Sequence, residues 1–278
     1  MKNILKIMLM MITIFTIAGS AVYAAEIPVS DQDQLITSRD WTEISNLQDE
    51  MKKEEPDATI DYDKALKVYV DCNLIKLQTA DTKKLTSALE SANYVWVIPF
   101  KMEKTYGMFT VAKGLPLSEE AKSVLTKAEQ EEVKNHAGKW MITETAEHTV
   151  EPYYDILLEK REALSDCTRV VLVGSQPGMR QPVALGMDDE TERIWISLGY
   201  QYPVMEKIPE TQNVESGVYS FDSVAEISDT YIEDSEVSTG AGVQSRSSMK
   251  YVAGIGIIVI GSILILSVLK KKKLEDYE

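Results

Sequence analysis

A run of eighteen residues near the C-terminus, Val252–Leu269, carries no charged side chain, and its only polar side chains are Ser262 and Ser267. A helix rises about 1.5 Å per residue, so this run would span about 27 Å, close to the thickness of a bilayer's hydrocarbon core. Four lysines, Lys270–Lys273, follow directly, and lysine is enriched on the cytoplasmic side of membrane spans. The sequence therefore predicts a transmembrane helix at 251–269 and a short cytoplasmic tail at 270–278. Everything before the helix is expected outside the cell.

The N-terminus has the pattern of a secretory signal peptide. Lys2 and Lys6 precede an apolar stretch, Ile7–Ala18, and Val22-Tyr23-Ala24 offers small residues before a cut at Ala25. We therefore expect a signal peptide at 1–24. The alternative is an uncleaved anchor, which would make a protein with two membrane spans.

The segment between these ends, 25–250, is strongly acidic. It holds 23 Lys and Arg against 41 Asp and Glu, a net charge near −18. Such a surface repels nucleic acid and anionic lipid and excludes nucleic acid as a partner. Simple solvation of the domain is the ordinary interpretation of this charge, and the alternative is that it could attract cations or basic partners.

The periodicity of this segment is typical of a mixed fold. Apolar residues in 38–55 recur every three or four positions, as in a helix, and Trp41 packs this helix on the domain or, alternatively, forms an exposed aromatic platform for a ligand. Strand patterns are expected at 65–72, 94–102, 106–113, 139–145, 168–173, 183–187 and 193–198, and helical patterns at 79–92, 118–137 and 152–165. Pro99 predicts an edge or a bulge in its strand.

Short hairpins with intervening helices predict an extracellular α+β domain at 25–208, with a mainly antiparallel sheet and packed helices. The order β-α-β-β occurs twice, which raises the hypothesis of a duplicated unit. Residues 209–250 are acidic and rich in Ser, Thr and Gly, and we expect a flexible stalk there. An apolar cluster within it, at 218–227, either docks on a partner or packs on the domain.

The most distinctive loop is 173–182, which contains two prolines and two glycines. It lacks the Lys-Ser/Thr of a phosphate loop, and its serine is not in a G-x-S-x-G pattern. A rigid connection between strands is one interpretation. The other is a recognition loop with four exposed polar contacts, Ser175, Gln176, Arg180 and Gln181.

Two further sets of residues carry candidate chemistry. Cys72 and Cys167 could form a disulfide in an exported domain, with two separate buried thiols as the alternative. Glu132, His136 and His148 could bind zinc if the fold brought them together, but no HExxH or CxxC motif supports this. Two surface histidines beside acids are the ordinary expectation.

No catalytic constellation emerges from these patterns, and no cofactor is predicted. The sequence favours a single-pass protein of the bacterial cell membrane whose ectodomain is a binding or accessory module, rather than an enzyme. Its partners would be membrane lipid around the helix and another envelope protein. The alternatives are a metal-assisted hydrolase acting on envelope material and a purely structural surface protein.

Overall fold

The computed structural model describes residues 27–77, 82–148, 151–174, 176–179, 181–188, 193–200, 202–209 and 213–228. The expected signal peptide at 1–24 and membrane helix at 251–269 lie outside them. Of the helices in the described part of the chain, none is both long enough and apolar enough to cross a bilayer.

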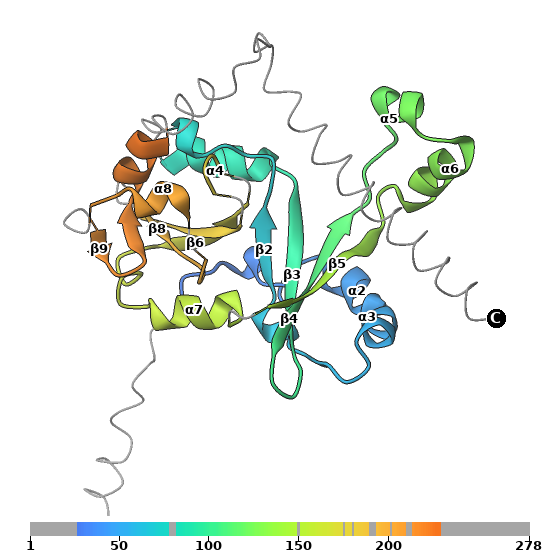
Figure 1. The fold of residues 1–278 in the computed structure, drawn as a ribbon, viewed down its shortest axis with the longest axis horizontal. Helices are drawn as coiled ribbons and strands as arrows, with labels where there is room; N and C mark the ends of the chain where they lie inside the picture. Colours follow the sequence, from blue (N-terminus) through green and yellow to red (C-terminus); the bar gives the residue numbers. More distant parts are fainter. Residues whose placement is uncertain are drawn as a thin grey trace, which may run out of the picture.

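The centre of the domain is one ten-stranded sheet, in the order β5-β4-β3-β2-β6-β7-β8-β10-β9, with β1 beside β3 (Figure 1). The strands are β1 Thr59–Ile60, β2 Leu66–Tyr69, β3 Tyr94–Lys101, β4 Tyr106–Lys113, β5 Trp140–His148, β6 Arg169–Val173, β7 Val183–Met187, β8 Arg193–Ile196, β9 Asn213–Glu215 and β10 Val218–Ser220. All the described pairs are antiparallel except β2 with β6. The expected α+β class with a mainly antiparallel sheet is confirmed.

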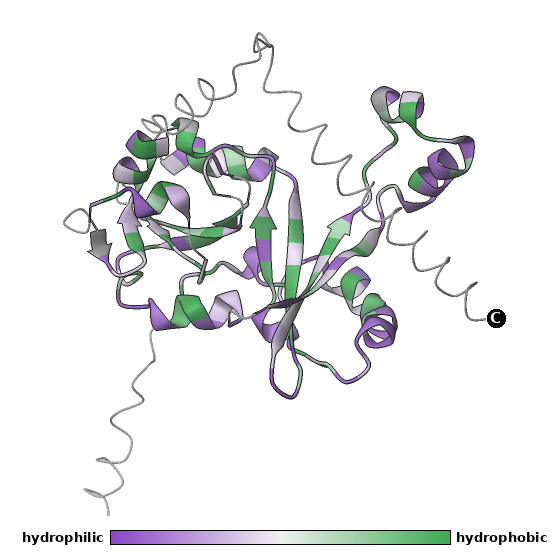
Figure 2. Ribbon diagram, in the orientation of Figure 1, coloured by the Kyte–Doolittle hydropathy of each residue, from purple (hydrophilic) through white to green (hydrophobic). Residues whose placement is uncertain are grey.

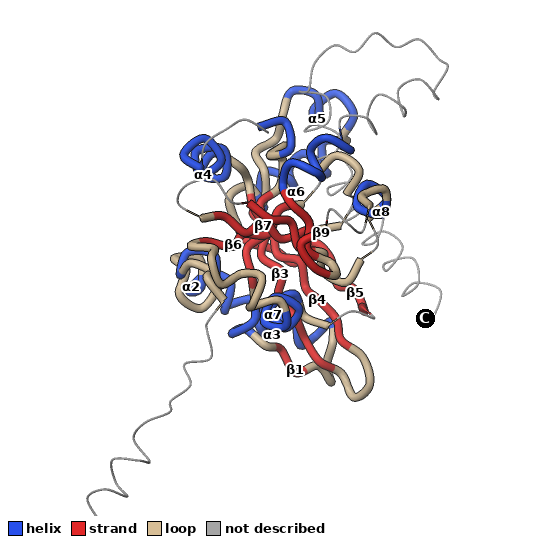
Figure 3. Tube along the Cα trace, turned by 90° about the vertical axis from the view of Figure 1, so that its left-hand side faces the viewer, coloured by secondary structure: helices blue, strands red, loops and turns tan. Residues whose placement is uncertain are grey.

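Short helices lie on both sides of this sheet (Figure 3). The α-helices are α2 Trp41–Ile44, α3 Gln48–Glu54, α4 Thr82–Ser91, α5 Glu119–Val124, α6 Lys127–His136, α7 Tyr153–Glu159 and α8 Pro203–Glu206, and residues 221–228 are also helical. The 3-10 helices are η1 Asp31–Asp33, η2 Ser45–Leu47, η3 Tyr62–Lys64 and η4 Ile75–Leu77.

Both faces of the central strands are buried, because successive side chains along a strand point to opposite sides. On one face, Val68, Leu172 and Ile196 pack with Leu157 of α7. The opposite face carries two separate clusters. One lies under α4, α8 and the helix at 221–228, and the other, which contains Trp96 and Phe109, lies under α2 and α3. Figure 2 shows hydrophobic positions along the strands and also on the helices that pack against them.

Residues 213–228, where a flexible stalk was expected, belong to the domain. β10 pairs with β8, and the following helix places Phe221 and Val224 in the core, with the Phe221 ring stacked 5.5 Å from that of Trp195. The boundary at 208 was wrong because the acids of this segment mask an amphipathic element, and the domain extends at least to residue 228. The alternative in which the apolar cluster packs on the domain is the correct one.

The two β-α-β-β groups do not form equivalent units. In the first group, β2 pairs with β3, whereas in the second β5 pairs with β4 and β6 lies beside β2. The helix expected at 118–137 is also two helices. Thr126 and Glu129 form a capping box that starts α6, and Leu125 before it is extended.

Candidate functional site

A buried carboxylate, Asp33, holds the N-terminal segment against the sheet. This segment enters between β2 and β6, pairing with Val170 through Val29 and with Leu66 through Gln34. Asp33 is 2% exposed and accepts hydrogen bonds from the hydroxyl of Tyr69 at 2.7 Å and from Nη2 of Arg169 at 2.9 Å. A charge this deeply buried is retained only when it is paired and hydrogen-bonded, and here both conditions are met.

Lys67 completes this network from the middle of β2. Its Nζ lies 3.6 Å from Asp33, 4.6 Å from the centroid of the Tyr94 ring and 5.2 Å from that of Trp96. Burial lowers the pKa of Lys67, and the nearby carboxylates oppose that shift. A cation is thus held inside the domain by aromatic rings and a carboxylate together.

A second buried carboxylate, Asp40, fixes the other end of the same segment. It accepts hydrogen bonds from the hydroxyl of Tyr94 at 2.9 Å and from the indole Nε1 of Trp96 at 3.1 Å. The chain between the two carboxylates carries Ile36, and Trp41 follows directly. The two buried carboxylates therefore position Ile36 and Trp41 at the surface.

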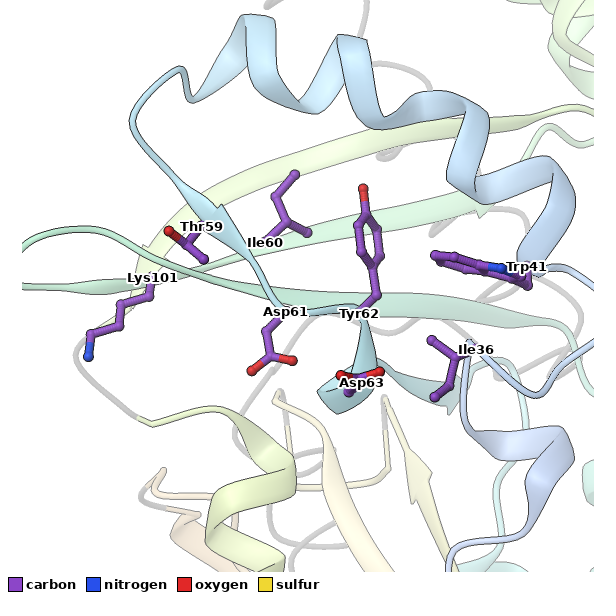
Figure 4. Close-up of a pocket in the computed structure, with 8 residues that line it drawn as sticks. All are labelled: Ile36, Trp41, Thr59, Ile60, Asp61, Tyr62, Asp63 and Lys101. Atoms are coloured by element: carbon purple, nitrogen blue, oxygen red, sulfur yellow. The ribbon is translucent and has the colours of Figure 1, made fainter.

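Ile36 and Trp41 line an open hollow of about 390 Å³ (Figure 4). β1 and η3 supply most of the opposite side, and Lys101 closes one end from β3. The complete lining is Ile36, Trp41, Thr59, Ile60, Asp61, Tyr62, Asp63 and Lys101. We call this feature the Trp41 hollow.

An aromatic pair dominates one end of the Trp41 hollow. The rings of Trp41 and Tyr62 meet edge to face, with centroids 5.2 Å apart, and both side chains remain partly exposed. The hydroxyl of Tyr62 points under α3 and lies 3.8 Å from Sδ of Met51, and burial raises the pKa of this hydroxyl. The pair is therefore held from behind and offers a contact surface that needs no rearrangement to form.

The charged side chains of the Trp41 hollow, Asp61, Asp63 and Lys101, differ in the partners they contact. Asp61 lies 3.8 Å from Nζ of Lys64, but that amine is closer to Asp155, at 2.8 Å, and the hydrogen bond to Asp155 is the main cause of the raised pKa of Lys64. Asp63 is exposed and has no hydrogen bond or ion pair within the described residues. The Nζ of Lys101 lies 5.9 Å from the ring of Tyr106, and in Figure 4 it points away from the aromatic pair.

In the loop at 173–182, where a recognition loop was one expectation, Gln176 is buried and is not available to contact a ligand. This side chain is 3% exposed, donates to the carbonyls of Cys72 and Gly174 and accepts from the amide of Leu74 at 3.0 Å. The expectation of an exposed contact was wrong, because a side-chain amide can satisfy several backbone groups of a tight turn at once. Gln181 is exposed, while Ser175 and Arg180 lie outside the described residues.

The alternative metal set is not brought together. Glu132 and His136 are exposed on α6, which joins β5 near Trp140, whereas His148 is at the far end of the same strand. Trp140 and His148 are eight residue steps apart along the strand, about 26 Å at the usual rise. Within the described chain, no cluster of three His, Cys, Asp or Glu could hold a metal ion.

The disulfide is also absent. Cys72 follows the C-terminal end of β2, and Cys167 precedes the N-terminal end of β6, which runs parallel to β2. The two thiols therefore lie at opposite ends of neighbouring strands and pack in different clusters, far beyond the Cα separation of about 6 Å that a disulfide requires. The alternative of two separate thiols is the correct one.

The lining of the Trp41 hollow was largely missed from the sequence. Trp41 was recognised as a possible ligand platform, but Ile36, Tyr62 and Asp63 were not. The triplet Asp61-Tyr62-Asp63, an aromatic residue between two acids just before a strand, is the signal that could have drawn attention to them.

Comparison with known proteins adds no relative: no family model, no curated protein and no solved structure matches this chain.

Proposed function

We propose that this protein is a membrane-anchored, extracellular binding module of a bacterial cell envelope, and that the Trp41 hollow is where its ligand sits. The expected signal peptide and the expected membrane helix with its four lysines support the location. The Trp41 hollow supports the binding role.

The observation that carries the proposal is a partly exposed aromatic pair on a rigid support. Tyr62 packs against Met51, and Trp41 follows Asp40, whose carboxylate is hydrogen-bonded to two residues of β3. Aromatic side chains that stay accessible while their surroundings are fixed are typical anchors of binding surfaces, since they contribute contact area with little loss of conformational freedom.

Photo-crosslinking in intact cells tests this proposal. The photo-reactive residue p-benzoylphenylalanine replaces Ile36, which is 37% exposed at the edge of the Trp41 hollow, in the full-length chain. Leu115 is the matched control, because it is also an exposed aliphatic residue, at 46%, and lies outside the lining.

We expect a light-dependent adduct from position 36 that is weak or missing from position 115 and that is reduced by Trp41→Ala. Light-dependent adducts of equal yield from both positions, or from neither, would contradict the proposal.

A further inference from the structure

We propose that the aromatic end of the Trp41 hollow recognises a cationic side chain, the ammonium of lysine or the guanidinium of arginine, in a basic segment of a protein partner. This inference rests on the proposed function, to which it adds the chemistry of the ligand.

The first support is the combination of groups at this end. A cation is attracted to the face of a Trp or Tyr ring within about 6 Å of its centroid, and a carboxylate beside the ring adds an ion pair. Trp41 and Tyr62 supply the rings, and an edge-to-face contact leaves ring faces that the pair does not use. In Figure 4 the carboxylate of Asp63 lies at the base of the Tyr62 side chain, next to Ile36, while the Tyr62 ring extends away from it.

The second support comes from inside the same domain. Lys67 is held over the rings of Tyr94 and Trp96 and near the carboxylate of Asp33. The Trp41 hollow presents the same residue types, a Trp, a Tyr and an Asp, but its own lysine, Lys101, points away from the rings (Figure 4).

The third support is charge. Asp63 has no partner among the described residues, so a ligand cation need not displace an existing ion pair. Residues 25–250 carry a net charge near −18, which attracts a basic partner over a longer range. A neutral saccharide could also stack on Trp41, but neither the free carboxylate nor the acidic surface would favour it.

The tryptophans allow a direct test with the full-length chain in detergent micelles. Of its four tryptophans, Trp96, Trp140 and Trp195 are at most 7% exposed, so Trp41 is the one whose environment a surface ligand changes directly. Incorporation of 5-fluorotryptophan gives one fluorine resonance per residue, and Trp41→Phe assigns the relevant one. The probe is the peptide acetyl-Gly-Lys-Lys-Gly-amide, and the same peptide with norleucine in place of lysine is its uncharged match.

We expect the lysine peptide to shift the Trp41 resonance in a saturable, salt-sensitive manner and the norleucine peptide to leave it unchanged. Asp63→Asn should weaken the binding of the lysine peptide by about two- to fivefold, the effect expected for the loss of a single exposed ion pair. Asp49→Asn, an exposed acid of α3 outside the lining, makes the same change in net charge and should have little effect.

Equal shifts by both peptides, no shift by the lysine peptide, or equal effects of the two Asn variants would overturn the inference. If a neutral oligosaccharide shifts the Trp41 resonance and the lysine peptide does not, the inference fails while the proposed function stands. The photo-crosslink at position 36 also distinguishes failure of this inference from failure of the proposed function, because the crosslink forms with a ligand of any chemical class.

Discussion

At the scale of single residues, the fold depends on a carboxylate that sequence patterns do not single out. Asp33 is one of 44 acids in the chain, and nothing in its immediate neighbours marks it as buried. Its importance appears only when β2 and β6 come together and bring Lys67, Tyr69 and Arg169 to one place. Long-range juxtapositions of this kind are invisible to local periodicity.

Removing that carboxylate should be costly. Asp33→Ala leaves the buried ammonium of Lys67 and the guanidinium of Arg169 without their anion, and we expect a loss of about 3–5 kcal/mol in the free energy of unfolding. Lys67→Met is the matched control, because Asp33 keeps its bond to Arg169 at 2.9 Å and methionine fills a similar volume. This variant should lose less than about 2 kcal/mol.

Urea unfolding of the full-length chain, followed by tryptophan fluorescence, measures both variants. If Asp33→Ala is as stable as the natural chain, or if Lys67→Met loses as much free energy of unfolding as Asp33→Ala, the buried network does not hold the N-terminal segment against the sheet.

At the scale of elements, the sequence predicted most strands and helices, and its errors have physical causes. The strands at 106–113 and 183–187 have the predicted bounds because their patterns are strong and their ends are marked by turns. Pro99 was expected to mark an edge or a bulge, yet β3 lies between β4 and the pair β1 and β2. Its carbonyl accepts from the amide of Asp61, just beyond β1, so Pro99 pairs at the end of that two-residue strand and lies outside the β2 ladder, which covers Tyr94–Val97 of β3.

The candidate site was less predictable than the elements. Most of the lining of the Trp41 hollow comes from a turn, a two-residue strand and a 3-10 helix, which are too short to show a periodic pattern; α2 adds Trp41 and β3 adds Lys101. The sequence indicated Trp41 alone. Its neighbours in space come from residues about twenty and sixty positions further along the chain.

The α5–α6 pair projects from the ends of β4 and β5, away from the rest of the domain (Figure 1). α6 buries none of its described side chains, Val124 of α5 is 69% exposed, and Gly114 and Ala137 close the base of the projection with a bridge. Since the core gains almost nothing from this element, it can be removed with little loss of stability.

We predict that replacing 115–136 with a short Asn-Gly turn changes the free energy of unfolding by less than about 1 kcal/mol, a range typical of surface changes. Urea unfolding of the full-length chain and of the shortened chain measures the difference. The crosslink from position 36 should persist in the shortened chain. A loss of several kcal/mol would mean that the projection supports the sheet.

At the scale of the whole molecule, burial couples stability to alkaline pH. Burial raises the pKa of Tyr69, Tyr153 and Tyr202 above the usual range of tyrosine, and burial also raises the pKa of Cys72 to about 11. These groups keep their protons in the folded chain while the unfolded chain loses them. Their contribution to stability is therefore complete below pH about 9 and is lost as the pH rises toward and beyond 11.

We predict that the free energy of unfolding falls by at least about 2 kcal/mol between pH 9.5 and 11, given about 1.4 kcal/mol per pH unit for each such tyrosine. Lys67, whose pKa is lowered, opposes this trend, but it is one group against at least these four. Tyr153→Phe keeps the ring and removes one of the four protons, so its pH dependence should be shallower. Urea midpoints that stay constant over this range would contradict the prediction.

Hydroxyl-radical footprinting of intact cells shows whether the Trp41 hollow is occupied in the cell. The oxidation rate of Trp41 is compared between cells and the purified full-length chain, with the exposed Val124 as internal reference. We expect Trp41 to be oxidised more slowly in cells, while the oxidation rate of Val124 is unchanged. Equal rates for Trp41 in the two settings would mean that nothing covers the hollow, and the binding role assigned to it would be wrong.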